Sequence, residues 1–592
     1  MKKVLSHLTE FKKECVLAPL FKMLEATFEL LVPLVMASVI DTGIRTADKG
    51  YIIRMCVILV GLGVIGLASS VTAQFFAAKA AIGFSTSLRH ALFSHIQSLS
   101  FAELDTIGNS TLITRMTSDV NQAQNGVNMF LRLFLRSPFI VIGAMVMAFT
   151  IDAKAALIFA ITIPILSLVV FIIMKFTIPM YKKVQSKLDR VLLNTRENLT
   201  GTRVIRAFHK EEDEISQFHA DHGELTGMQL FVGRISALMN PLTYIIINLA
   251  IIALLYVGAF RVNQGIITQG QLVALVNYMS QILVELIKLA NLIVTLTKAT
   301  ASIGRVESLL LIQSTMEFAA VTQNTAGENR ERKTEKNTGE NKRVPSVSFE
   351  HVSLTYKDAG AEALSDIDFK VYKGETIGII GGTGAGKTSL VHLIPRYYDV
   401  TKGSVLLSGK NVKEYSQAEI HKKVGVVMQN AVLFKGTIRE NLLWGSENAT
   451  DKQIWEALSI SQAKEFVDLK SDKLDTQIEQ GGKNLSGGQR QRLSITRTLM
   501  QKPEVLILDD SSSALDYATD AKLRKAIREM KEAPTVFVVT QRTSSVMHAD
   551  KIIVLDDGEI KGIGTHESLL ESCDIYKEIY DSQFEKGEEH SA

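Results

Sequence analysis

Long hydrophobic runs dominate the first half of the chain. Residues 55–78, 155–174 and 235–260 contain no Asp, Glu, Lys or Arg. Each run reaches the length of about 20 apolar residues that a helix needs to cross a bilayer. These runs predict three membrane-spanning helices.

Three further runs, residues 16–40, 133–150 and 271–297, are apolar but interrupted by charge. One such run could be a buried helix of a soluble protein, but six runs in series favour six transmembrane helices. An even number places both chain ends on one side of the membrane, and basic residues near the first span favour the cytoplasm. Those residues are Lys2, Lys3, Lys12 and Lys13.

The connections between the runs alternate in length. Residues 151–154 and 261–270 are short links, whereas residues 80–132 and 176–234 are long, charged and rich in helix formers. The long links would therefore lie in the cytoplasm as extensions of the membrane helices.

Charged side chains within the weaker runs need a polar environment. Glu25 and Glu29 lie one helical turn apart and share a face, as do Glu285 and Lys288 approximately. Because charge facing lipid is costly, these groups should face a cavity, the bundle interior or the headgroup layer. Glu25 and Glu29 are candidates for a substrate pathway, where they would favour cations.

Arg132 and Arg136 form a third pair on one helical face. The simplest interpretation places them at helix ends that reach the cytoplasm or snorkel to the headgroups.

The second half has the composition of an ordinary soluble protein. Residues 321–343 carry charges of both signs without an apolar cluster, which is typical of a flexible linker. From Pro345 onward, short β runs alternate with helical segments, an α/β pattern. We therefore expect a membrane domain at 1–320, a linker at 321–345 and an ATP-binding domain at 346–592.

Bulk properties exclude other classes of protein. The formal net charge of +3 gives no case for nucleic-acid binding. Cys15, Cys56 and Cys573 lack the spacing of a metal site or a disulfide framework, which fits a reduced cytosolic setting. The N-terminal residues have lysines but no compact apolar core before a small-residue cleavage site, so we expect no cleaved signal peptide.

A phosphate-binding motif occurs in "ETIGIIGGTGAGKTSLVHLI", where strand 376–380 precedes a glycine loop and a helix. The motif matches G-x-x-x-x-G-K-[ST], in which backbone amides surround phosphate oxygens. Lys387 would reach the β- and γ-phosphates, and Thr388 would bind Mg²⁺. The predicted ATP contacts are Gly381, Gly382, Thr383, Gly384, Ala385, Gly386, Lys387, Thr388 and Ser389.

The run "VLILDD" at 505–510 is a second part of the same site. An apolar strand that ends in carboxylates downstream of a P-loop predicts that Asp509 holds the magnesium ion.

Ser486 can cap a helix whose first amides belong to Gly487 and Gly488, which makes a second anion-binding helix end. The surrounding "LSGGQ" resembles the signature of ATP-binding-cassette (ABC) ATPases. The signature residues are Leu485, Ser486, Gly487, Gly488 and Gln489.

This resemblance covers nearly the whole chain and implies an ABC exporter half-transporter. The implied fold is a membrane domain of six helices with long cytoplasmic extensions, followed by an α/β P-loop domain. In that family, two halves dimerise head to tail and hold two ATP molecules with Mg²⁺. Each ATP lies between the P-loop of one half and the signature of the other.

The resemblance also assigns roles to individual residues. Tyr356 would stack on adenine, Gln429 would contact Mg²⁺ and sense the membrane domain, and Asp516 would contact the opposite site. Residues 108–120 and 197–208 resemble the two coupling helices, and the second would dock on the partner's cassette.

Two positions depart from the family pattern. Asp510 stands where the family has a catalytic glutamate, and Gln541 where it has a switch histidine. We expect this site to bind ATP through Lys387, Thr388 and Asp509 but to hydrolyse it slowly.

An intact signature beside a weak hydrolytic site predicts a heterodimer, resembling the degenerate-site subunit of bacterial multidrug exporters. The partner would supply the glutamate and histidine, and the pair would export amphipathic small molecules across the plasma membrane. Alternatives are a homodimer with two slow sites, a lipid flippase, a peptide exporter, and an ATP-gated channel or regulatory subunit. The absence of a preceding peptidase domain disfavours peptide processing.

Overall fold

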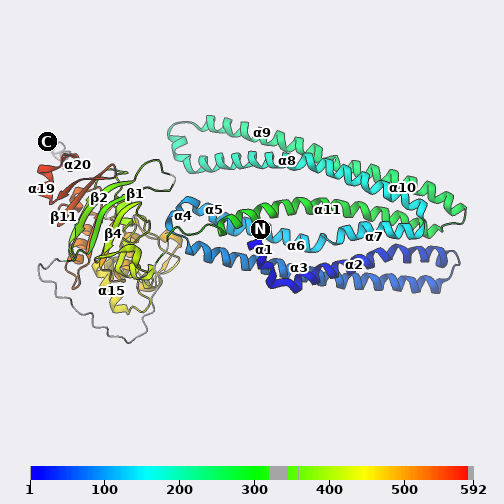
Figure 1. The fold of residues 1–592 in the computed structure, drawn as a ribbon, viewed down its shortest axis with the longest axis horizontal. Helices are drawn as coiled ribbons and strands as arrows, with labels where there is room; N and C mark the ends of the chain where they lie inside the picture. Colours follow the sequence, from blue (N-terminus) through cyan, green and yellow to red (C-terminus); the bar gives the residue numbers. More distant parts are fainter. Residues whose placement is uncertain (1, 317, 319–343, 358, 512, 585–592) are drawn as a thin grey trace. The chain divides into compact units, whose positions relative to one another are not determined.

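The computed structural model describes residues 2–316, 318, 344–357, 359–511 and 513–584 (Figure 1). The predicted linker at 321–343 lies outside these residues. The chain divides into two compact units. A helical membrane unit contains residues 1–97 and 109–312, and a cassette unit contains residues 98–108 and 313–592.

The membrane unit consists of long helices that run side by side (Figure 1). Six helical stretches of the described chain are long and apolar enough to cross a membrane, which confirms the predicted six spans. They are Lys3–Ile44, Lys49–Ser98, Asn109–Ile151, Ala153–Ala207, Glu211–Asn263 and Gln269–Leu310. The α-helices are α1 (Lys2–Leu5), α2 (Lys12–Ser38), α3 (Lys49–Ser98), α5 (Asn109–Thr114), α6 (Val120–Leu133), α7 (Arg136–Ile151), α8 (Ala153–Ala207), α9 (Glu211–Ala237), α10 (Met239–Asn263) and α11 (Gln269–Leu310).

Helix length shows that the bundle extends beyond the bilayer. Helix α8 has 55 residues, which at 1.5 Å per residue is about 80 Å, against a hydrocarbon core of about 30 Å. The long links predicted from the sequence are therefore continuations of the spans.

The short link between α7 and α8 is fixed by one acid. The Asp152 carboxylate accepts a hydrogen bond from the Ala155 backbone N–H at 2.9 Å and thereby caps α8. The same carboxylate pairs with Arg261 at the end of α10, with Nε at 3.1 Å. This pair joins two helix ends on the same side of the bundle.

Small and aliphatic side chains fill the centre of the bundle, where α11 packs on α2 and α7. Tyr278 of α11 is fully buried, and its hydroxyl donates to the Leu30 carbonyl of α2 at 2.6 Å. The polar end of this large side chain is thus satisfied within an apolar core.

The cassette unit is built on two larger sheets, in the orders β2-β1-β4-β5 and β12-β11-β3-β10-β9-β6. In the larger sheet, the five strands from β11 to β6 are parallel and β12 is an antiparallel edge. The strands are β1 (Val347–Leu354), β2 (Leu364–Val371), β3 (Thr376–Ile380), β4 (Lys402–Leu407), β5 (Lys410–Asn411), β6 (Val424–Val427), β7 (Gly436–Thr437), β8 (Gln477–Ile478), β9 (Val505–Asp509), β10 (Thr535–Val539), β11 (Lys551–Asp556) and β12 (Glu559–Gly564).

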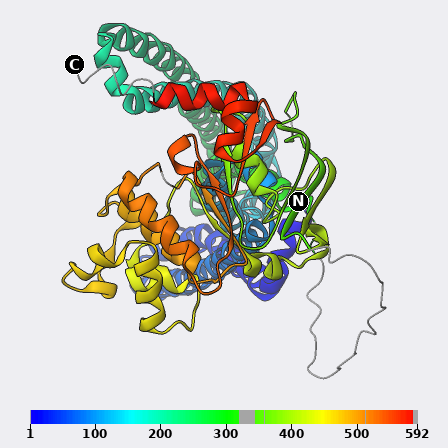
Figure 2. The same cartoon turned by 90° about the vertical axis from the view of Figure 1, so that its left-hand side faces the viewer.

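Helices of the cassette form separate groups around the sheets. A cluster of buried residues between Leu433 and Met500 gives α14 to α17 a hydrophobic core of their own. Figure 2 shows α15 (yellow) well away from the red C-terminal helices α19 and α20. The α-helices are α4 (Phe101–Ile107), α12 (Lys387–His392), α13 (Gln417–Lys423), α14 (Ile438–Leu443), α15 (Asp451–Ile460), α16 (Lys464–Asp468), α17 (Gly487–Leu499), α18 (Tyr517–Arg528), α19 (His566–Ser572) and α20 (Asp574–Phe584).

Candidate functional site: a nucleotide pocket and a membrane cavity

The predicted P-loop lies at the carboxyl end of the central strand β3, where open parallel sheets bind ligands. Two of its glycines are required by the backbone. Gly386 has φ +91°, and a Cβ there would come within 2.8 Å of the Ala363 carbonyl oxygen. A Cβ on Gly381 would come within 2.0 Å of the Leu555 carbonyl oxygen. The loop can therefore keep its tight curve only with glycine at these two positions.

Lysine and threonine at the end of this loop face two different partners. The Lys387 ammonium donates to the carbonyls of Gly381 and Gly382 at 2.8 and 2.6 Å. The Thr388 hydroxyl donates to Oδ1 of Asp509 at 3.1 Å. The structure thus brings Lys387, Thr388 and Asp509 to one pocket, as the sequence analysis expects.

Two carboxylates reach the pocket from β9. Asp509 is buried, and burial, reinforced by the neighbouring charge of Asp510, raises the pKa of its carboxyl. Asp510 has φ +45°, a left-handed conformation that Asp tolerates better than most residues. The Gln429 amide donates to Oδ2 of Asp510 at 3.3 Å.

Strand β10 carries the remaining predicted residue, Gln541, just beyond its carboxyl end. The Asp510 N–H donates to the Val539 carbonyl at 3.0 Å, which ties the two strand ends together. The side chains of Asp510 and Gln541 contribute to the wall of a cavity of about 400 Å³. That wall is formed by Tyr356, Glu362, Ala363, Thr383, Gly384, Ala385, Gly386, Lys387, Thr388, Ser389, Gln429, Asp509, Asp510, Val539, Thr540, Gln541, Asp557 and Gly558.

The side chains of this pocket suit a nucleotide with magnesium. Thr388 and Asp509 place a hydroxyl and a carboxylate oxygen 3.1 Å apart, and hard oxygen donors are what Mg²⁺ prefers. When bound, the ion would neutralise charge on the phosphates. Tyr356 lies at the same wall, with its hydroxyl donating to Ser389 Oγ at 2.9 Å.

The predicted signature does not join its own chain's pocket. Ser486 is exposed at the start of α17, where it forms a capping box with Gln489. The Gln489 N–H donates to Ser486 Oγ at 3.3 Å, and the Ser486 N–H donates to Gln489 Oε1 at 3.1 Å. Asp516 caps α18 and accepts from the Thr519 N–H at 2.9 Å.

Comparisons with known proteins agree with both halves of this architecture. Residues 15–286 match the family model "ABC transporter transmembrane region", and residues 364–513 match the family model "ABC transporter". The uncharacterized ABC transporter ATP-binding protein YfiB of Bacillus subtilis (strain 168) is 34% identical over 584 residues, covering 99% of each chain. The chain belongs to the ABC transporter family.

Other relatives span this ABC transporter equally fully. YgaD of Bacillus subtilis (strain 168), provisionally named a multidrug export ATP-binding/permease protein, is 30% identical over 98% of this chain and 99% of its own. The solved structure of a bacterial Atm1-family ABC exporter with ATP bound aligns with a TM-score of 0.77 and 20% identity. It covers 97% of this chain and 98% of that one, and shows that the two share the exporter fold.

Within the cassette unit, the short helix α4 makes a contact that the sequence analysis did not predict. Phe101 packs on Tyr397 with ring centroids 4.4 Å apart, and the Tyr398 hydroxyl donates to Asp105. The first coupling helix was predicted at 108–120, but those residues lie almost entirely in the membrane unit. The coupling role of residues 108–120 stays a prediction, whereas the aromatic packing of α4 leaves no periodic signal in the sequence.

The same aromatic cluster reaches the nucleotide pocket. His392 stacks near Tyr398, with centroids 6.4 Å apart, and its Nε2 lies 3.6 Å from Oδ2 of Asp509. Tyr356 meets Tyr398 edge to face at 5.1 Å. Burial raises the pKa of Tyr397 to about 12, so its hydroxyl stays protonated. A residue pattern gives no signal for this cluster, because its members come from separate segments.

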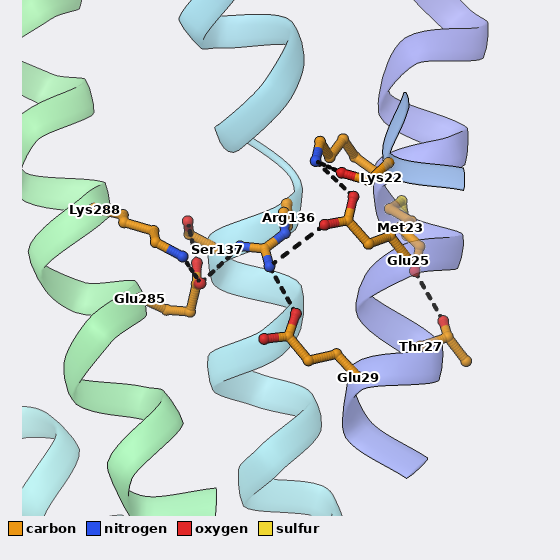
Figure 3. A network of polar contacts seen from close by, with 10 residues as sticks. Lys22, Met23, Glu25, Thr27, Glu29, Arg136, Ser137, Glu285 and Lys288 are labelled. Carbon is orange, nitrogen blue, oxygen red and sulfur yellow. Dashed lines mark hydrogen bonds and ion pairs between the residues drawn. The ribbon is translucent and has the colours of Figure 1, made fainter. Parts of the chain in front are cut away.

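The membrane unit of this ABC transporter contains a second cavity, of about 960 Å³, between α2, α3 and α11. Glu25 and Glu29 both contribute to its wall, as the substrate-pathway hypothesis requires. Figure 3 shows that they converge on Arg136, whose Nη2 lies 2.7 Å from Glu29 and 3.9 Å from Glu25. Arg136 does begin α7, but the interpretation that its side chain reaches the cytoplasm or snorkels to the headgroups was wrong, because the side chain is buried among carboxylates.

A third carboxylate completes this network. Glu285 of α11 accepts from Arg136 Nη1 at 2.7 Å and from Lys288 at 2.8 Å, both on Oε1, and from the Ser137 hydroxyl at 2.7 Å on Oε2 (Figure 3). The predicted shared face of Glu285 and Lys288 is confirmed by this contact. Its partner Arg136 is 149 residues away and could not be found from spacing.

Proposed function

We propose that this chain is one half of a heterodimeric exporter that uses ATP to move amphipathic small molecules out of the cell. In this proposal, its own P-loop site binds ATP and hydrolyses it slowly. Its signature completes a faster site on a partner half that carries the catalytic glutamate and switch histidine. The cassette and both chain ends would face the cytoplasm, with the membrane unit in the plasma membrane.

The observation that carries the proposal is the pair Asp510 and Gln541 beside an otherwise complete pocket. Aspartate withdraws the carboxylate by about 1.5 Å relative to glutamate, and a misplacement of about 1 Å can cost about 10²-fold in rate. Glutamine cannot bring positive charge to a γ-phosphate, a kind of loss that can cost about 10²–10³-fold. Together they support a slowdown of the order of 10²–10⁴, because such effects do not multiply fully.

Binding should persist in the same pocket. Lys387, Thr388 and Asp509 keep the contacts that hold phosphate and magnesium in P-loop proteins. The name of YgaD, which refers to multidrug export, supports the substrate class of the proposal.

In the proposed cycle, ATP binding closes two cassettes by placing a P-loop and a signature helix end around each nucleotide. Closure is transmitted to the bundle, which opens outward. Hydrolysis at the partner's site removes the γ-phosphate that bridges the two halves, and the bundle returns to the inward-facing state.

The test compares the chain alone with the assembly that a tagged copy forms in its native membrane. We expect the lone chain to hydrolyse ATP about 10²–10⁴-fold more slowly than the assembly, since only the assembly contains a glutamate-based site. Lys387→Ala in this chain should reduce ATP binding at its own site while sparing most of the assembly's turnover.

The matched change of the partner's P-loop lysine should abolish the assembly's turnover. Fast hydrolysis by the lone chain, lost on Asp510→Asn, would contradict the proposal. Native mass measurement of the assembly separates a heterodimer from a homodimer with two slow sites.

A further inference from the structure

A network of ionised side chains with balanced formal charge borders the cavity of the membrane unit, and five of its six members, all but Lys22, contribute to the cavity wall. Both signs of charge come from three helices, α2, α7 and α11, and meet around one guanidinium (Figure 3). Three carboxylates, Glu25, Glu29 and Glu285, are joined to three cationic side chains, Lys22, Arg136 and Lys288. The formal charge of the set is therefore zero.

Two of the carboxylates are fully committed to these neighbours. Both oxygens of Glu285 accept hydrogen bonds, from Arg136, Lys288 and Ser137. Glu25 pairs with Lys22 at 2.5 Å, and Lys22 also donates to Ser70 at 3.0 Å. Neither acid offers a free charge to a cation entering the cavity.

Two groups of opposite sign remain accessible at the ends of the network. The Glu29 side chain is 39% exposed and uses one oxygen to bind Arg136, and the Lys288 side chain is 42% exposed. They lie on α2 and α11, on opposite sides of Arg136 (Figure 3). Between and around them the wall is mostly apolar, with Phe28, Val32, Met36, Leu59, Leu62, Leu67 and Val284.

Two buried polar atoms of the cavity wall lack a hydrogen-bond partner in the part of the chain that the structure describes. They are Nε of Arg136, a donor, and Oε1 of Gln281, an acceptor. Buried polar atoms are normally satisfied, so the wall has capacity for both an acceptor and a donor from a bound molecule or water.

We propose that the preferred substrate is an amphiphile with a zwitterionic head, one amine and one acid group, on an apolar body. This inference rests on the proposed export function. The amine would pair with Glu29 and the acid with Lys288, while the apolar body lies against the hydrophobic wall. A head with a single charge would leave one of these groups facing a like charge, which is costly in a site of low dielectric.

The zwitterionic head could belong to a membrane phospholipid or to a soluble amphiphile. The experiment uses the assembly purified with the tagged chain and reconstituted in vesicles. Three fluorescent probes share one alkyl tail and carry a quaternary ammonium, a carboxylate or an amino-carboxylate head. A fourth probe is fluorescently tail-labelled phosphatidylethanolamine, whose transfer between leaflets distinguishes the lipid source from the soluble one.

We expect ATP-dependent movement of at least one zwitterionic probe with kcat/KM about tenfold above that of either singly charged probe. Movement of the amino-carboxylate probe identifies the soluble source, and movement of the phospholipid identifies the lipid source. A cationic or anionic probe that moves faster than both zwitterions overturns the inference while leaving the export function intact. No ATP-dependent movement of any probe overturns the export function and this inference together.

Two variants test the assignment of each charge. Lys288→Gln should shift the preference about tenfold toward the cation, and Glu29→Gln about tenfold toward the anion. Glu14→Gln is the matched control, because Glu14 is a carboxylate of α2 that pairs with Lys79 at 2.9 Å outside the cavity wall. Equal effects of both test variants on all probes would overturn the proposed roles, and the wild-type comparison stands even if a variant fails to assemble.

Discussion

Backbone conformation at Asp510 bears directly on the chemistry of the nucleotide pocket. Its φ of +45° is held by the hydrogen bond from its N–H to Val539 and by the turn that follows β9. Asp and Asn visit this left-handed region more readily than residues with longer side chains. The carboxylate is therefore short and also set by a constrained backbone, with Gln429 as its neighbour.

Restoring the longer acid should partly restore hydrolysis. We expect Asp510→Glu to raise the ATPase rate of the lone chain by about tenfold, below the full 10²-fold that carboxylate placement can provide, since glutamate is less suited to φ +45°. Adding Gln541→His should raise it further. Phosphate release measured with and without Lys387→Ala gives the hydrolysis rate of this site. An unchanged rate in Asp510→Glu and in the double variant with Gln541→His would refute the degenerate-site assignment.

Sequence reasoning at this scale succeeds where the chemistry is local. Gly381, Lys387 and Thr388 are adjacent in the chain, so one motif locates them all. Arg136 and Glu285 are 149 residues apart, and only the folded bundle brings their charges within 2.7 Å.

Among the elements, the short helix α4 is notable because it contacts aromatic side chains beside the nucleotide pocket. It is seven residues long and begins at a capping box of Ser100 and Glu103. Its Phe101 and Asp105 contact Tyr397 and Tyr398, which adjoin the wall of the nucleotide pocket through His392 and Tyr356. Through these side chains, a shift of Asp509 on nucleotide binding can reach α4, although α4 itself does not contact the nucleotide pocket.

Loss of the hydrogen bond between the Tyr398 hydroxyl and Asp105 should reduce the coupling of ATP hydrolysis to transport more than it reduces hydrolysis itself. Tyr398→Phe keeps the ring against Tyr356 but removes the hydrogen bond to Asp105, worth about 1 kcal/mol or a factor of about five. We expect transport per ATP to fall about fivefold in vesicles, with ATPase activity nearly unchanged. Asp105→Asn should have a smaller effect, because its amide can still accept the bond, and an equal loss of both activities would contradict a coupling role.

The boundaries of β3 and β9 could be predicted from the pattern of apolar residues, whereas the contacts of α4 could not. The pattern predicts a strand at 376–380 and a second strand that ends in Asp509, because apolar runs bounded by glycine or acid leave few other interpretations, and β3 and β9 confirm both. The α4 contact depends on aromatic rings from distant segments, for which the chain has no periodic signal.

On the scale of the whole molecule, the division into two compact units means that unfolding need not be a single step. The membrane unit buries its own core around α11, and the cassette unit buries two sheets and a helical cluster. Each unit has a separate cavity, one suited to nucleotide and one to an amphiphile.

Nucleotide should therefore stabilise one unit selectively. At 100 times its dissociation constant, Mg²⁺-ATP should add about 2.7 kcal/mol to the unfolding free energy of the cassette unit. Thermal unfolding with one fluorescent label in each unit should show a higher midpoint for the cassette label alone. Lys387→Ala should remove the shift, and removal of Mg²⁺ by chelation should reduce it. A shift of equal size at both labels in the lone chain would show that the units unfold together.

The capping box of α17 has a consequence for the hydroxyl of Ser486. Its oxygen accepts a hydrogen bond from the Gln489 backbone N–H, while its own O–H stays free to rotate toward another acceptor. Ser486 is exposed, so its hydroxyl is accessible to a group outside the chain. The chain thus presents an exposed hydroxyl at the start of α17 that can donate a hydrogen bond to a negatively charged group that approaches it.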